Sequence, residues 1–435
     1  MESFFEVIDY HNLSKTRLRE EVGKMSLSQI GDIAESLSET VKASTSHQMK
    51  REDMFDLYLG GSLNGSSDFG CRNLSCRLDT LKKAGAFSVL YSNKAYIPDY
   101  FNSYHHLVGK LDESQMKQRF FDDLIVINEL RGAFEKGKLE LFHLDLCPTC
   151  ASVSLAGFDN IFTKEYIEEL TDFYLDNLEA EVRFYRGGKL LKIEDKSQSL
   201  LDHEGIFRND KILQNVPDGK VGREVLKEIG LVKKLIMKEL SVLKFHYANS
   251  SYLGTPLLTD RNAHDKFLSQ VNIQNEYSKY NSVMQQLHLE TPIVENVSID
   301  SIIRLKEAEE DAFENYKITL KKSIQSFVKE KDSITSEMIQ EFYNDNIASE
   351  LINLNRKMRN SKSLATKKTL GGALITGVAL GVGLTTQFVS PTVLQTLGLF
   401  TFLGTTGTSA IDMFQTPNDI KNSNYYFLWK LQNSK

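Results

Sequence analysis

The sequence predicts two unlike halves: an α+β N-terminal half with short strands and interleaved helices, and an all-α C-terminal half that ends in an apolar helical hairpin. Three observations predict this. Strand patterns occur only before residue 215, and helical periodicity continues alone from Gly222. No side chain in residues 369–411 is charged, although 25% of the whole chain is. We therefore expect an α+β domain over residues 1–215, a helical bundle or stalk over 216–362, the hairpin over 363–411 and a tail over 412–435.

The composition limits the classes of function. The 435 residues carry a net charge of −6, which argues against a general nucleic-acid binder because such proteins carry a basic excess. No basic stretch followed by an apolar run opens the sequence, so we expect no secretory signal. Four cysteines are too few for a disulfide scaffold. These features predict a cytoplasmic body.

The first 215 residues contain mixed signals. Residues 1–59 are predicted to be helical, with a capping box formed by Ser26 and Gln29. Apolar runs and amphipathic periodicity predict the elements that follow, which are a helix over 74–83, strands over 86–91 and 95–97, a helix over 113–135, a strand over 139–144, a helix over 164–177, and a hairpin of 182–186 with 189–193 around Gly187 and Gly188.

Residues 60–70 hold four glycines and predict a flexible surface loop. The loop lacks the Gly-Lys-Ser/Thr ending of a phosphate-binding loop and the spacing of a dinucleotide-binding motif. Charged residues in and after it could hold a polar ligand, and they make this the candidate ligand pocket: Asp68, Arg72 and Arg77. Polarity of an ordinary loop is the alternative.

All four cysteines fall in two close pairs, Cys71 with Cys76 and Cys147 with Cys150. Four thiolates brought together by the fold would form a closed, structural zinc site, and His143 could replace one of them. A redox pair or ordinary buried cysteines are the alternatives.

After Gly222 the chain reads as helical over 225–243 and 263–287, in a long helix through 305–327 and in a last one over 336–359. The uncharged segment then divides near Pro391 into two arms of about 20 residues, each long enough to cross a bilayer. Small side chains recur along one face of the first arm and favour close helix packing: Ala373, Gly377, Gly381 and Thr385.

Basic residues precede the segment: Arg356, Lys357, Arg359, Lys362, Lys367 and Lys368. Such a flank favours the cytoplasmic face and attracts anionic lipid headgroups. An uncharged hairpin can also be the buried centre of a soluble helical domain.

Together these features predict a membrane-associated, non-enzymatic effector or scaffold, toxin-like or defence-like, attached to the inner face of the cell membrane. Its partners would be membrane lipid, further copies of the chain and an unidentified protein. Two alternatives stay open. One is a soluble protein-interaction module with the hairpin as core, and the other is an enzyme with a site near residues 60–80 or 202–204.

Overall fold

The computed structural model describes residues 2–14, 16–45, 56–68, 73–107, 109–144, 158–185, 188–196, 205–208, 210–261, 299–331, 336–357 and 418–433, with isolated residues at 155, 263–264, 267, 283–284 and 334. The chain divides into two compact units. The larger unit comprises Met1–Ile293, Ser298–Ile303 and Ile324–Ile339, and the C-terminal unit comprises Val294–Val297, Arg304–Ser323 and Gln340–Lys435.

Three helices open the larger unit: α1 (Glu2–Tyr10), α2 (Leu18–Lys24) and α3 (Leu27–Thr45). The capping box before α3 is confirmed. The Gln29 backbone N–H donates to Ser26 Oγ at 3.2 Å, and the Ser26 N–H donates to Gln29 Oε1 at 2.8 Å. The helical prediction for this region is wrong at residues 57–59, which form a strand.

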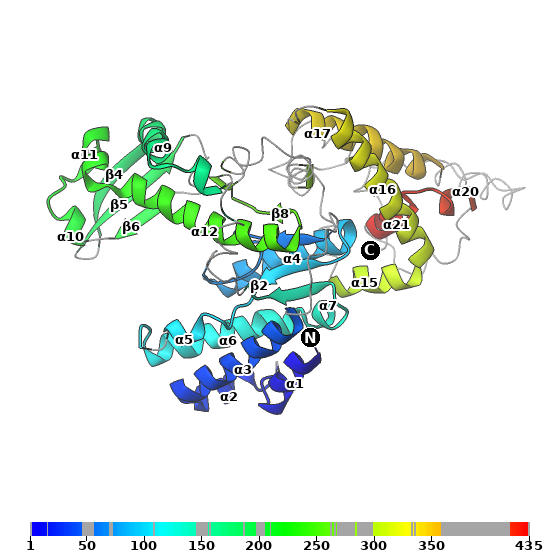
Figure 1. Cartoon of the computed structure of the whole chain (residues 1–435), viewed down its shortest axis with the longest axis horizontal. Coiled ribbons are helices and arrows are strands. Elements are labelled where there is room, and N and C mark those ends of the chain that lie inside the picture. Colours follow the sequence, from blue (N-terminus) through cyan, green and yellow to red (C-terminus); the bar gives the residue numbers. More distant parts are fainter. Residues whose placement is uncertain are drawn as a thin grey trace, which may run out of the picture. The chain divides into compact units, whose positions relative to one another are not determined.

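A four-stranded sheet forms the centre of the larger unit, in the order β3-β2-β1-β8, and every neighbouring pair is parallel (Figure 1). Its strands are β1 (Leu57–Leu59), β2 (Ala95–Pro98), β3 (Leu139–Phe142) and β8 (Leu257–Leu258). The three residues of β1 are wholly buried. A parallel strand covered on both faces reads as a short apolar run rather than an alternating one, and this explains why β1 and β8 were not predicted.

Helices connect these strands. Between β1 and β2 lies α4 (Leu74–Tyr91), and between β2 and β3 lie α5 (Tyr104–Leu107), α6 (Glu113–Glu129) and α7 (Arg131–Glu135). The strand predicted over residues 86–91 is wrong, because α4 continues to Tyr91. Residues 84–91 of that helix are all buried. A helix buried on every side has no polar face, so its sequence looks like a buried strand.

A second sheet is inserted between β3 and β8. It is antiparallel, in the order β6-β5-β4-β7, and α9 (Lys164–Asn177), α10 (Asp210–Leu213) and α11 (Arg223–Ile229) accompany it (Figure 1). Its strands are β4 (Leu178–Tyr185), β5 (Gly188–Asp195), β6 (Gly205–Arg208) and β7 (Gly219–Val221). The predicted helix over 164–177 and the β4–β5 hairpin are confirmed, and Tyr185 pairs with Gly188.

The long helix α12 (Leu231–Leu253) leads from the inserted sheet back to β8, and it contacts α9 at one sheet and β1 and β8 at the other. Buried side chains of α12, including Leu235, Ile236 and Leu243, belong to one apolar cluster with Val182 of β4 and Tyr58 of β1. The two sheets therefore share a continuous core.

The C-terminal part is helical, as predicted. Its described elements are α15 (Ile299–Ala308), α16 (Glu310–Glu330), α17 (Ser336–Tyr343), the π-helical turn η1 (Asn344–Ala348), α20 (Asn418–Lys421) and α21 (Tyr426–Asn433). Within the C-terminal unit, Phe313 and Tyr316 of α16 pack on Phe427 of α21. The mixed α and β content of the N-terminal part and the helical C-terminal part are confirmed. The expectation of helices alone after residue 215 is wrong, because β7 and β8 lie beyond it.

No helix in the described part of the chain is both long and apolar enough to cross a membrane. The hairpin predicted over residues 369–411 lies outside the described residues.

Candidate functional site

The parallel sheet has a topological switch point between β1 and β8. From β1 the chain proceeds to β2 and then to β3 on one side, whereas β8 adds to the other side of β1. In open parallel sheets, ligands bind outside the carboxyl ends of the strands at such a point. Polar residues stand at these ends: Asp99 follows β2, His143 follows β3 and Thr259 follows β8, while the glycine-rich loop follows β1.

Most of the described part of that loop is buried, so its prediction as a surface loop is wrong there. Residues 60, 61 and 63–66 are all buried. Gly61 and Gly65 have φ values of +60° and +69°, which side chains other than glycine rarely adopt. A Cβ atom on Gly61 would lie 2.5 Å from Asp260 Oδ1 and 2.9 Å from Thr259 Oγ1. The loop has glycine there because the residues after β8 approach its backbone closely.

Ser62 joins the loop to Asp260. The Ser62 backbone N–H donates to Asp260 Oδ1 at 2.9 Å, and the Ser62 hydroxyl donates to Asp260 Oδ2. One carboxylate therefore accepts two hydrogen bonds from one residue. This contact joins the segment after β1 to the segment after β8 at the switch point.

Beneath this contact, Glu239 of α12 is bound by two residues that follow β8. Arg261 Nη1 lies 2.5 Å and His264 Nε2 lies 3.2 Å from Glu239 Oε2. Burial alone would raise the pKa of Glu239, but the hydrogen bond from His264 and the charge of Arg261 outweigh it and lower that pKa to about 2. Glu239 is therefore a fixed, ionised group near the sheet edge.

A neutral histidine lies beside this cluster. His246 of α12 is wholly buried, and a Cβ atom on Gly60 would lie 3.2 Å from its ring. Burial lowers the pKa of His246 well below its usual range, and the charges of His264 and Arg261 lower it further. The groups behind the loop thus include the carboxylate of Glu239, the guanidinium of Arg261 and the imidazoles of His264 and His246, of which that of His246 is neutral.

The far end of the loop is held by a buried ion pair. Arg77 of α4 binds Asp123 of α6, and its Nε donates to the carbonyl oxygen of Gly65 at 2.7 Å. Burial lowers the pKa of Arg77, but the charge of Asp123 outweighs this effect and the pKa rises. Tyr104 donates to Asp123 Oδ2 at 2.8 Å, and the Tyr100 hydroxyl donates to the carbonyl oxygen of Asn64. The loop backbone is therefore fixed by side chains of two other elements.

Arg119 of α6 forms the outer part of this network. Its Nη2 donates to Asp68 Oδ2 at 2.6 Å and to Ser103 Oγ at 3.0 Å. Its Nε lies 3.8 Å from Asp123 Oδ2, which is too long for a hydrogen bond. Asp68 and Arg119 thus meet where the loop reaches the surface.

At the other edge of the sheet, Asp99 connects β2 with β3 and α3. Its Oδ2 accepts a hydrogen bond from Ser38 Oγ at 2.6 Å and lies 3.6 Å from His143 Nδ1, and its Oδ1 accepts one from the Phe101 N–H. Asp99 binds other residues of the fold, which favours a role in holding β2, β3 and α3 in position.

Of the three predicted pocket residues, Asp68 belongs to the loop and binds Arg119, and Arg77 binds the loop at Gly65. Arg72 lies outside the described residues. Cys76 is exposed in the first turn of α4. Residues 71, 147 and 150 lie outside the described part, so the zinc site stays a prediction. The same holds for residues 202–204 and for the small-residue strip. Of the basic flank, Arg356 and Lys357 are described and exposed.

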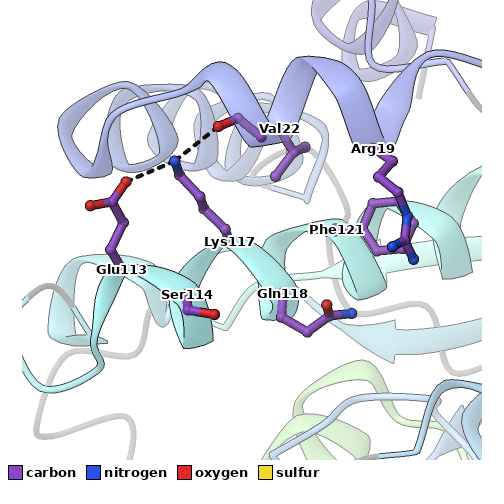
Figure 2. Close-up of a pocket in the computed structure, with 8 residues that line it drawn as sticks. Arg19, Val22, Glu113, Ser114, Lys117, Gln118 and Phe121 are labelled. Carbon is purple, nitrogen blue, oxygen red and sulfur yellow. Dashed lines mark hydrogen bonds and ion pairs between the residues drawn. The ribbon is translucent and has the colours of Figure 1, made fainter.

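A surface groove of about 500 Å³ lies between α2 and α6 (Figure 2). Lys117 spans it, bound to Glu113 at 2.7 Å and to the carbonyl oxygen of Gly23 at 3.0 Å, and Arg19 lies over the Phe121 ring. Its lining contains none of the residues at the carboxyl edge of the sheet. It is a groove between two surface helices whose polar groups already bind one another.

Comparisons with protein-family models, with curated protein sequences and with solved structures find no match for this chain. The site therefore rests on geometry alone.

Proposed function

We propose that the chain is a membrane-directed effector or scaffold with two working parts. The larger unit binds a small polar ligand at the loop after β1, where Asp68, Arg72 and Arg77 were predicted. The C-terminal unit presents residues 369–411 to anionic lipid, where copies associate through Ala373, Gly377, Gly381 and Thr385. The observation that carries this proposal is the contact between the helix before that segment, at Asn355, and the helix after it, at Trp429.

The two sides of the segment are joined within the C-terminal unit. Trp429 Nε1 donates to Asn355 Oδ1 at 2.8 Å, so the last helix before the segment is bonded to the helix that follows it. Lys430 pairs with Glu309, and the Phe427 ring packs edge-to-face on Phe313 at 4.8 Å. Described residues before and after the segment therefore contact each other, which favours a hairpin that enters a bilayer from one side.

Charge at the exit of the segment supports the same proposal. Arg356 and Lys357 are exposed at the end of the described helix, and they open the basic flank that precedes the uncharged segment in the sequence. Each basic residue near an anionic bilayer contributes about 1 kcal/mol of attraction. Seven consecutive tail residues from Tyr425 to Leu431 include six with at most 5% exposure, so the tail belongs to the body of the unit.

Detergent extraction of cells that produce the full chain tests this proposal. The wild-type chain should stay with the membrane fraction until detergent is added. The double variant Gly377→Asp, Gly381→Asp should be released without detergent, because a carboxylate is costly in the hydrocarbon core. The matched control is Gly23→Asp, Gly222→Asp, which adds the same two charges at glycines that have open space around them and no positive φ. Release of the wild-type chain without detergent would count against the proposal.

A second candidate is an enzyme, and one contact favours it. His264 Nδ1 lies 3.3 Å from the Thr259 hydroxyl oxygen, and its Nε2 lies 3.2 Å from Glu239. A hydroxyl, an imidazole and a carboxylate in series can transfer a proton. Hydrolysis of p-nitrophenyl acetate or p-nitrophenyl phosphate by the wild-type chain, and its loss in His264→Asn, would support this candidate. Equal rates for the two proteins would exclude it for these ester classes.

A further inference from the structure

We propose that the corner formed by residues 60–68 and Arg119 binds a small molecule through an oxyanion, a phosphate or a carboxylate, which replaces the Asp68 carboxylate on Arg119. This inference rests on the ligand-binding part of the proposed function, for which it names the ligand chemistry and the residues. It does not depend on the membrane part.

The position of this corner is the first reason. The loop follows β1, the strand at the switch point of the parallel sheet, where ligands of this fold class bind. Its backbone is already fixed by Arg77 at Gly65 and by Tyr100 at Asn64. A ligand would therefore meet a preformed loop and would not have to order it, which favours affinity.

The second reason is a set of buried donors. Within the described part of the chain, Asn64 Nδ2, Ser67 Oγ and Arg119 Nε have no hydrogen-bond partner, although each atom is buried. Asn64 has no exposed surface at all. Each such group destabilises the fold while it is unsatisfied. All three can donate a hydrogen bond, so an acceptor would satisfy each of them.

Charge selects an oxyanion among acceptors. The buried Arg77 is neutralised by the equally buried Asp123. Arg119 is neutralised by Asp68, whose side chain is 35% exposed, whereas that of Arg119 is 15% exposed. Asp68 is thus the carboxylate of this network that can most readily turn into solvent, because it is the more exposed partner of its pair. An incoming oxyanion would keep the charge of Arg119 paired.

The geometry of Asp68 agrees with such an exchange. Its carboxylate is held by Arg119 at 2.6 Å and by a long contact of 3.5 Å from Ser103 Oγ. Ion pairs with a partly exposed partner contribute little to stability. A phosphate or carboxylate that bonds Arg119 and also the loop donors makes more hydrogen bonds than Asp68 does.

Isothermal titration calorimetry on the full chain tests the proposal, with inorganic phosphate, AMP and succinate as probes at constant ionic strength. We expect at least one probe to bind, and we expect Asp68→Asn to tighten its binding about tenfold because the internal competitor is removed. Arg119→Gln should abolish that binding. The preferred probe then distinguishes a free phosphate, a nucleotide-like phosphate ester and a carboxylic acid.

The matched control is Asp9→Asn. Asp9 also forms an exposed ion pair with an arginine, binding Arg131 through two contacts of 2.8 Å, but no glycine-rich loop lies there. This variant should bind the probes as the wild type does. If none of the probes binds Asp68→Asn, or if Asp68→Asn and Asp9→Asn bind them equally, the proposal is wrong, and the three donors are satisfied by water. Membrane extraction of Asp68→Asn stays as in the wild type, so failure here is separable from failure of the membrane part.

Discussion

Ser62 donates both its backbone N–H and its hydroxyl to the carboxylate of Asp260, across 198 residues of chain. The contact joins the loop after β1 to the residues after β8. A hydrogen bond to a charged group contributes about 1.5–3 kcal/mol. Ser62→Ala, which removes one of the two bonds, should therefore lower the free energy of unfolding by about 1–2 kcal/mol in urea denaturation. Ser114→Ala, at an exposed serine of α6, should leave it unchanged, and equal values for the two variants would contradict this role.

Gly61→Ala should destabilise the chain more than Gly137→Ala does. Both glycines have φ near +60°, so both substitutions carry the same backbone cost of about 1 kcal/mol. A methyl group on Gly61 also meets Asp260 and Thr259, whereas one on Gly137 meets nothing within 4 Å. The difference between the two unfolding free energies, measured by urea denaturation, isolates the cost of that close approach. No difference would mean that the loop can move away from β8.

The buried pair of Arg77 and Asp123 should be costly to break from one side. Asp123→Asn leaves the Arg77 guanidinium buried without its charged partner, and Arg77→Met does the same to the Asp123 carboxylate. We expect each variant to lower the free energy of unfolding by about 3–5 kcal/mol. The double variant Arg77→Met, Asp123→Leu should lose less than the sum of the two single losses. Arg131→Met, at an exposed pair, should cost about 0–1 kcal/mol. Additive single losses at the buried pair would contradict its coupling.

The lowered pKa of Glu239 predicts how the free energy of unfolding depends on pH. Its pKa of about 2 lies below the value of 4.5 for an unperturbed glutamate, so the folded state favours the ionised form. The stabilisation, about 3 kcal/mol, is therefore complete above pH 4.5 and is lost as the pH falls toward 2. Glu239→Gln should lower the free energy of unfolding at pH 7 and flatten its decline between pH 5 and 3. An unchanged slope in that variant would assign the acid sensitivity to other groups.

The predicted zinc site can be tested by elemental analysis of the full chain purified without chelator. We expect about one equivalent of zinc, because structural sites of this kind take four ligands and no water. Cys76→Ser should lower the zinc content, while His105→Ala should not. Less than about half an equivalent in the wild-type chain would count against the site.

Regular elements with an exposed face were predictable. Of the candidate site, the sequence indicated the loop with Asp68 and Arg77 but not the partners that α6, α12 and the residues after β8 contribute. The helix over 164–177 and the β4–β5 hairpin show their periodicity directly, whereas the buried end of α4 and the two-residue strand β8 do not. The site draws residues from the loop after β1, from α6 and from the segment after β8, which only the topology brings together.

One signal for the site was nevertheless present in the sequence. Asp123 lies in the apolar face of α6 with Phe120, Leu124 and Ile127, and Glu239 lies in that of α12. A charged residue in an otherwise apolar helical face has to find a buried partner. Both do: Asp123 binds Arg77, and Glu239 binds Arg261.

The uncharged residues 369–411, which lie in the sequence between Asn355 and Trp429, are the central element of the proposal. Flotation of the purified full chain with liposomes tests it most directly, using vesicles with and without 30% phosphatidylglycerol, a composition in which each basic residue near the surface adds about 1 kcal/mol. We predict that the chain rises with the anionic vesicles and that Gly377→Asp, Gly381→Asp stays at the bottom of the gradient. A wild-type chain that stays at the bottom with both kinds of vesicle would contradict the account.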